Sequence, residues 1–118
     1  MSEKQFFLDW QDNIDAGIIL EQNWMLEEIS KKFPEGIKFY CFSIDRDIYV
    51  IKNKDRKFAF VQSNGSSSTA CYVEELLKRN AKEIYRVGTC GSLQDHINVG
   101  DVVLSSAAIR DEGTSDQY

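Results

Sequence analysis

Two short glycine-containing segments carry the residue types best suited to bind a small anion. Gly65 follows one apolar run, and residues 88–91 (GTCG) follow another, with Arg86 three residues before Thr89. Glycine lets backbone N–H groups approach an anion closely, Thr89 adds a hydroxyl donor, and a guanidinium can bond two phosphate oxygens at once. The pattern indicates an anion site. The alternative, in which Arg86 is solvated and the glycines only form turns, stays open.

Other reactive side chains lack the partners that catalysis or metal binding needs. His96 is the one histidine of the chain, and its residue type suits proton transfer near neutral pH, but we interpret it as a solvated loop residue. Cys41, Cys71 and Cys90 show no CxxC spacing, so we expect no metal site. No histidine flanks Cys90, which argues against a nucleophilic thiol. The sequence therefore assigns no catalytic residue.

Apolar residues at helix and strand spacing predict the elements that must position these segments. They are a strand over 16–20, a helix over 24–33, strands within 38–51 and 57–61, a helix carrying Tyr72, Val73, Leu76 and Leu77, and strands over 83–87 and 102–105. We expect turns at 45–47 and 53–55, and we expect Ser and Thr to cap the second helix. This order predicts an α/β fold, in which ligands collect beyond the carboxyl ends of strands.

The length and composition of the chain exclude several classes of protein. With 118 residues, 42% of them hydrophobic and 28% charged, the chain suits one globular domain over 1–118. A net charge of -5 argues against nonspecific binding to nucleic acid, which needs an excess of Lys and Arg. No apolar run resembles a signal peptide or a membrane span, so we expect no membrane partner and a cytoplasmic location.

Three stretches near the end of the chain resemble the nucleoside phosphorylase family in one continuous frame. Residues 86–93 (RVGTCGSL) and 99–104 (VGDVVL) resemble the signature of the hexameric and uridine-type enzymes, and residues 107–115 (AAIRDEGTS) resemble the segment that follows it. Similarity over 16–77 is weaker. The resemblance implies a mixed central sheet flanked by helices, with this chain as the N-terminal portion and about half of the family fold.

The resemblance also implies roles for particular residues. Arg86 and Thr89 fall on the phosphate-binding arginine and hydroxyl residue of the family, and Thr89 would also contact ribose. Cys90 and Gly91 fall on positions that line the base pocket. Gly65 falls in the loop that closes near the sugar and phosphate. These residues would form the phosphate-binding and nucleoside-binding parts of one site.

The resemblance is less direct at Arg46 and at residues 20–25. Arg46 resembles the arginine that family members lend to a neighbouring subunit's phosphate, or it is a solvated turn residue, and both interpretations stay open. Residues 20–25 (LEQNWM) stand where the family has a Gly-Asp-Pro-x-Arg type loop. Glu21 would repel a phosphate dianion unless it pairs with Arg46 or Arg86. The family's ribose-binding Met-Glu pair and its catalytic aspartate have no counterpart in this sequence.

By resemblance the protein cleaves the N-glycosidic bond of a nucleoside with phosphate as co-substrate, giving free base and ribose 1-phosphate. No metal or organic cofactor is implied, and a homo-oligomer, a dimer or hexamer, is expected. The alternative is a shortened, inactive homologue that acts as a nucleoside-binding or assembly module. Preference for purine or pyrimidine, and attack by phosphate or by water, stay open.

Overall fold

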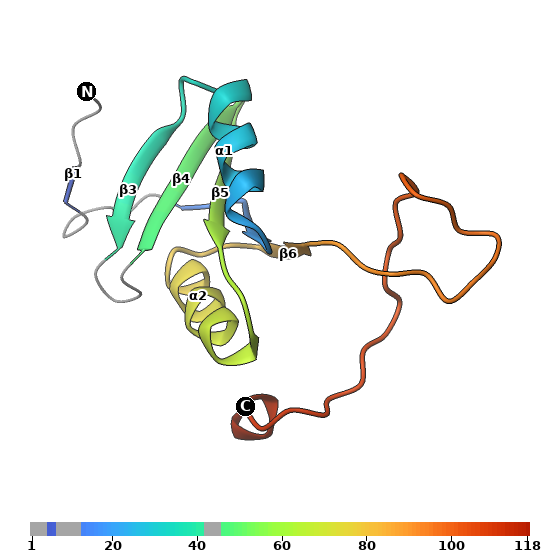
Figure 1. The fold of residues 1–118 in the computed structure, drawn as a ribbon. Helices are drawn as coiled ribbons and strands as arrows, with labels where there is room; N and C mark the ends of the chain where they lie inside the picture. The colour runs from blue at the N-terminus through green and yellow to red at the C-terminus, as the bar shows by residue number, and fades with distance from the viewer. Residues whose placement is uncertain (1–4, 7–12, 42–45) are drawn as a thin grey trace.

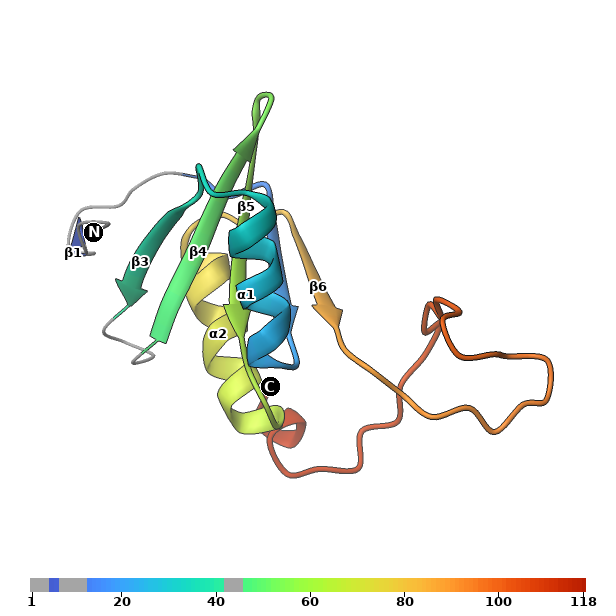
Figure 2. The ribbon, with the colours of Figure 1, turned by 45° about the horizontal axis from the view of Figure 1, so that its top comes forward.

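A mixed sheet with one helix on each face forms the body of the protein in the computed structural model (Figures 1 and 2). The structure describes residues 5–6, 13–41 and 46–118. Within them the sheet has six strands in the order β1-β3-β4-β5-β2-β6. The elements are β1 (Gln5–Phe6), β2 (Ala16–Leu20), α1 (Asn23–Lys32), β3 (Ile37–Cys41), β4 (Arg46–Asn53), β5 (Arg56–Gln62), α2 (Ser66–Lys78), β6 (Glu83–Val87) and the 3-10 turn η1 (Ser115–Gln117). The predicted α/β class is confirmed.

Strand direction divides the sheet into two parts. β2 runs parallel to both β5 and β6, which are its neighbours. β4 is antiparallel to β3 and to β5. The three parallel strands therefore end at the same edge of the sheet, which is where ligands bind in open α/β folds.

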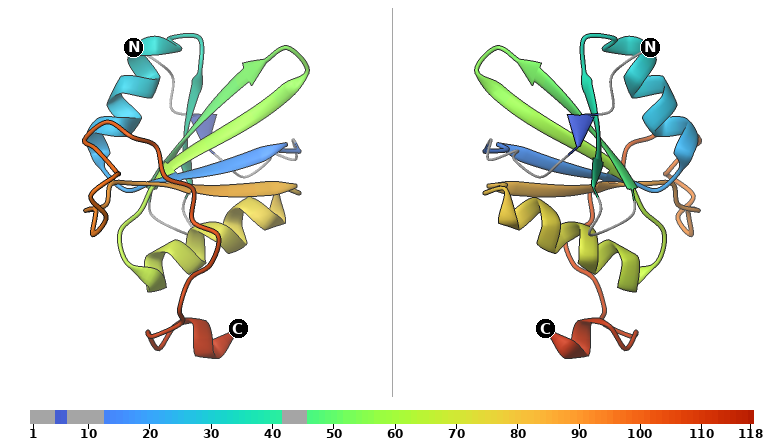
Figure 3. Two further views of the ribbon diagram at one scale, coloured as in Figure 1. Left: turned by 90° about the vertical axis from the view of Figure 1, so that its right-hand side faces the viewer. Right: turned by 90° about the vertical axis from the view of Figure 1, so that its left-hand side faces the viewer.

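The core lies between the sheet and its helices, which cover opposite faces (Figure 3). A Cβ added to Gly17 of β2 would lie 2.6 Å from Leu76 Cδ1 of α2, so Gly17 faces α2. Strand residues alternate between faces, so Ile19 points the same way, and both Ile19 and Leu76 are 1% exposed. Hydrophobic burial of such side chains is the main source of stability. α1 packs on the other face, against β2 and β5.

The predicted hairpin is confirmed, but the turn before it is only partly described. Lys54 and Asp55 connect β4 to β5, and Lys54 adopts a left-handed φ of 55°. Of the turn expected at 45–47, Asp45 lies outside the described residues. Arg46 and Asp47 are the first residues of β4 and pair with β3, so for these two residues the turn prediction is wrong. Their polar side chains indicated a turn, whereas pairing with β3 decides the outcome.

The expected Ser and Thr cap of α2 is wrong. The residue before the helix is Gly65, with φ of 79°, and no side-chain cap is formed among the described residues. The serines and Thr69 lie inside the first turn, and their hydroxyls bond elsewhere. Ser63 Oγ, for example, lies 3.0 Å from Thr69 Oγ1. A glycine is favoured at this position because a positive φ strains other residues.

The strand predicted over 102–105 is also wrong. Residues 88–114, all of them described, form no helix or strand and extend away from the sheet (Figure 1). Val102 is 98% exposed and Leu104 is 92% exposed. The apolar run of residues 102–104 is typical of a strand, yet a strand needs a neighbour to accept its backbone hydrogen bonds. None of the helices in the described part of the chain is long and apolar enough to cross a membrane.

Candidate anion and nucleoside site

The parallel strands bring three loops together at one edge of the sheet. Backbone hydrogen bonds join them just past the strand ends. Ser63 N donates to Leu20 O at 2.9 Å, and Glu21 N donates to Val87 O at 2.9 Å. The side chain of Gln62 adds a third link, because its Nε2 donates to Glu21 O at 3.0 Å. The segments after β2, β5 and β6 are thus held side by side, as their positions after predicted strands indicated.

Arg86 and Thr89 meet at this edge on the carboxylate of Glu21. Thr89 donates its backbone N–H to Glu21 Oε2 at 2.7 Å and its hydroxyl to the same oxygen at 3.2 Å. Arg86 Nη2 lies 3.6 Å from Glu21 Oε1. The hydrogen bond from the Thr89 amide, with help from the Thr89 hydroxyl and the Arg86 charge, lowers the pKa of Glu21. Of the two partners considered for Glu21, the structure selects Arg86.

Gly88 makes this contact sterically possible. A Cβ added at Gly88 would lie 2.5 Å from Glu21 Oε2 and 3.2 Å from Arg86 Nη1. Any larger residue would therefore push the carboxylate or the guanidinium away. Because Gly88 has no side chain, the charged groups of Glu21 and Arg86 can lie close to its backbone, which is the role expected of glycine in an anion-binding loop.

Arg46 reaches the same edge of the sheet but a different part of it. It begins β4, whose register against β5 continues toward the end of β5 near Gln62. β5 and β2 stand between β4 and β6, so the backbones of Arg46 and Arg86 are about 14 Å apart at 4.8 Å per strand. The structure brings Arg86 and Thr89 together and leaves Arg46 outside their cluster. The interpretation of Arg46 as a turn residue is wrong, because Arg46 begins β4, and its role at a neighbouring subunit's phosphate stays a prediction.

The residues just after Gly65 contact a part of the chain that the sequence did not connect to them. The hydroxyls of Ser66 and Ser67 lie 3.1 and 2.9 Å from Thr114 Oγ1. Glu112 holds Thr114 in this position, because its carboxylate accepts a hydrogen bond from the backbone N–H of Thr114 at 2.9 Å. Side-chain hydrogen bonds, first from Ser115 and then from Ser66, lower the pKa of Glu112 to about 2. No local pattern signals a contact between residues 47 positions apart.

Cys90, Gly91 and His96 lie on the exposed segment that follows Thr89. A Cβ added to Gly91 would meet no described atom within 4 Å. His96 is exposed in a turn, in agreement with its interpretation as a solvated loop residue. The roles of Cys90 and Gly91 in a base pocket stay predictions. Among the described residues, no group of three His, Cys, Asp or Glu side chains is placed to hold a metal ion.

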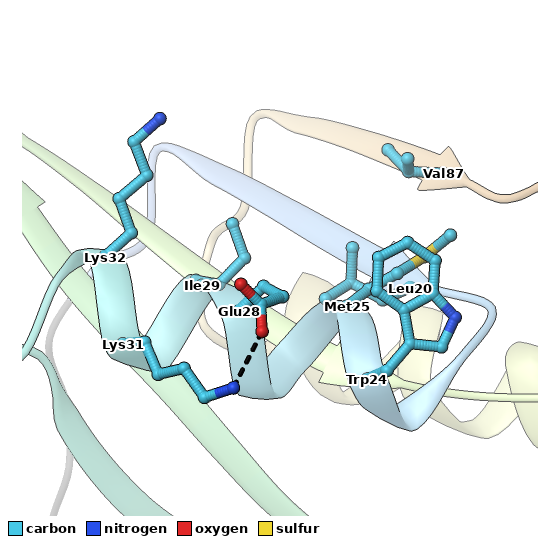
Figure 4. Close-up of a pocket in the computed structure, with 8 residues that line it drawn as sticks. All are labelled: Leu20, Trp24, Met25, Glu28, Ile29, Lys31, Lys32 and Val87. Carbon is cyan, nitrogen blue, oxygen red and sulfur yellow. Dashed lines mark hydrogen bonds and ion pairs between the residues drawn. The ribbon is translucent and has the colours of Figure 1, made fainter. Parts of the chain in front are cut away.

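A groove lies beside α1, on the face of the sheet that α2 does not cover (Figure 4). It is an open groove of about 570 Å³ lined by Leu20, Trp24, Met25, Glu28, Ile29, Lys31, Lys32 and Val87. Arg86 and Val87 are successive residues of β6, so their side chains point to opposite faces of the sheet. The groove is therefore separate from the cluster of Arg86 with Glu21 and Thr89.

Comparison with known proteins defines the family. Residues 15–118 match the model of the Phosphorylase superfamily, and the chain belongs to this family. It is 44% identical over 54 residues to a uridine phosphorylase of Haemophilus influenzae, covering 46% of this chain and 21% of that protein. A uridine phosphorylase of Salmonella typhimurium is 45% identical over 93 residues, covering 70% and 37%. A guanosine phosphorylase of Halorubrum lacusprofundi is 44% identical over 54 residues, covering 46% and 22%.

These relatives confirm the resemblance to nucleoside phosphorylases. The matched segments span between a fifth and two fifths of the relatives' own length. Family membership and the mixed α/β sheet are therefore established for this chain.

Proposed function

We propose that the protein cleaves the N-glycosidic bond of a nucleoside with inorganic phosphate, releasing the free base and ribose 1-phosphate. Its relatives include a uridine phosphorylase and a guanosine phosphorylase. The observation that carries the proposal is the convergence of Arg86 and the Thr89 N–H and hydroxyl on one carboxylate. These are the donors that a phosphate would need.

In this reaction a phosphate oxygen forms a bond to the anomeric carbon while the bond from that carbon to the base breaks. The electron pair of the broken bond leaves with the base, which takes up a proton. Arg86 and Thr89 would orient the phosphate and balance its charge, so they would act by positioning and electrostatics. We assign no residue to the donation of the proton, and no metal or organic cofactor is needed.

The nucleoside would lie next to this phosphate, over the loops at the sheet edge. Gly65 and Thr89 would face the sugar, and Cys90 and Gly91 would line the base pocket. Arg46 lies across two strands from Arg86, which fits a role at the site of a neighbouring subunit. We therefore propose a homo-oligomer, a dimer or hexamer, and place it in the cytoplasm, where free phosphate is available as co-substrate.

A nucleoside-binding or assembly module without turnover is the second candidate. The observation that favours it is the exposure of β6, where Tyr85 is 50% and Val87 is 45% exposed. β6 is also an edge strand of the described sheet, and such edges can pair with another chain.

The test is phosphorolysis by the purified protein with inosine, adenosine, guanosine or uridine, with the free base followed by chromatography. We expect base release that requires phosphate, and a loss on the order of 10²-fold in kcat/KM for Arg86→Ala. Arg56→Ala is the matched control, because both arginines pair with a glutamate and their side chains are 56% and 54% exposed. Release without phosphate would indicate hydrolysis. No release, with a nucleoside still raising the Tm, would support the second candidate.

A further inference from the structure

We propose that Glu21 is a built-in competitor for the anion site, whose carboxylate occupies the position between Thr89 and Arg86 that phosphate must take. The inference rests on the proposed function, because it assumes that these two residues bind phosphate. It adds that the protein controls phosphate affinity with a side chain of its own. Glu21 must leave before phosphate can bind.

The carboxylate uses the same donors that an incoming phosphate would use. Oε2 of Glu21 accepts two hydrogen bonds from Thr89, at 2.7 and 3.2 Å, and Oε1 faces Arg86 Nη2 at 3.6 Å. Charge-assisted contacts of this kind are stronger than neutral hydrogen bonds. One backbone N–H cannot point fully at two anions, so the carboxylate and a phosphate oxygen exclude each other.

Space and charge lead to the same conclusion. The carboxylate lies directly over Gly88, where even an added methyl carbon would come within 2.5 Å of Glu21 Oε2. A whole phosphate group, with four oxygens around phosphorus, is larger than a methyl group, so it cannot share this position. A phosphate dianion next to Glu21 would also meet a like charge, which is repulsive at this range. The site therefore holds one anion at a time.

The competitor can leave without disturbing the fold. The backbone of Glu21 is held by hydrogen bonds to Val87 O and from Gln62 Nε2. Its side chain is 23% exposed, so rotation about its own bonds can carry the carboxylate into water. Rotations of exposed side chains are fast. Phosphate affinity is thus set by competition, with all of the donors still in place.

The experiment is titration of the purified protein with inorganic phosphate by calorimetry at low ionic strength. We expect Glu21→Gln to bind phosphate about tenfold more tightly than the wild type, since a charged hydrogen-bond acceptor is removed from the site. Glu28→Gln is the matched control, because this substitution also removes one negative charge. In the wild type, Glu28 pairs with Lys31 and not with Arg86. The gain should disappear in the Glu21→Gln, Arg86→Ala double variant.

Three results would overturn part of this scheme. Equal phosphate affinity in the wild type and Glu21→Gln would exclude competition by Glu21 and leave the phosphate site standing. An equal gain in Glu28→Gln would show a general effect of net charge. No phosphate binding in any variant, with unchanged Tm, would reject the phosphate site and the proposed function. Glu21→Ala is the second variant if Glu21→Gln does not fold.

Discussion

Strand-forming side chains occur both before and after residue 88, but they have different structures. The described residues of 13–87 form a sheet with two helices, whereas residues 88–118 form no strand. In the first region, Ile19 and Val61 are each 1% exposed, in strands paired on both sides. In the second, Val102 and Leu104 are 98% and 92% exposed, in a segment with no strand. The difference teaches that an apolar segment rich in strand-forming residues becomes a strand only where another strand is available.

Polar contacts join the second region to the first. Near its start, Thr89 binds the carboxylate of Glu21. Near its end, Thr114 meets the hydroxyls of Ser66 and Ser67, and Tyr118 donates its hydroxyl to Glu74 at 2.6 Å. Exposed contacts of this kind contribute little each. The stability of the described chain therefore comes from the first region.

The largest expected effect separates two leucines, one from each region. Leu76→Ala removes a side chain that is 1% exposed in the core, and we expect a loss of about 3 kcal/mol in the free energy of unfolding. Leu104→Ala changes a side chain that is 92% exposed, and we expect a change within about 0.5 kcal/mol. Urea denaturation measures both. A large loss in Leu104→Ala would mean that the second region packs in solution.

A smaller loss of stability is expected when one glycine from each region is replaced by alanine. Gly17→Ala would bring a methyl group within 2.6 Å of the buried Leu76 side chain, and we expect a loss of about 1–2 kcal/mol. Gly91→Ala meets open space, and we expect a stability within about 0.5 kcal/mol of the wild type. Thermal unfolding of the two variants is the measurement. Equal stability of Gly17→Ala and Gly91→Ala would mean that there is room for a methyl group between β2 and α2.

The smallest effect concerns the polar attachment of the second region. Glu112 has its pKa lowered to about 2 from 4.5, because Ser115 and Ser66 donate hydrogen bonds to the charged form. The stabilisation of this turn is therefore fully present above pH 4.5 and is lost as the pH falls through about 2. The Thr114 amide resonance should titrate with that low midpoint and become independent of this group in Glu112→Gln. A midpoint near 4.5 would contradict the contact.

Local patterns predicted most elements of the first region. The helical spacing of Trp24, Met25 and Ile29 and the turn residues Lys54 and Asp55 correctly placed α1 and the β4–β5 hairpin. They succeeded because each pattern is completed by neighbours in the sequence. The strand at 102–105 failed because it depends on a partner strand elsewhere in the chain. The cap of α2 failed because Gly65, and not a serine or threonine, precedes the helix.

The candidate site shows the same division. Arg86 and Thr89 were predicted as parts of one site, because both belong to the segment that resembles the family. The choice between Arg46 and Arg86 as partner of Glu21 could not be made from sequence. It follows from strand order, which places β6 beside β2 and keeps β4 two strands away.

The sequence by itself determined the family, the α/β class and the segment that carries Arg86 and Thr89. These properties depend on residue types and on spacing over a few turns or strands. Only the tertiary structure decided that the Glu21 carboxylate binds Thr89 beside Arg86 and that Thr114 contacts the start of α2. The physical reason is that such contacts join residues 47 to 68 positions apart. Their geometry exists only after the parallel strands have aligned their ends.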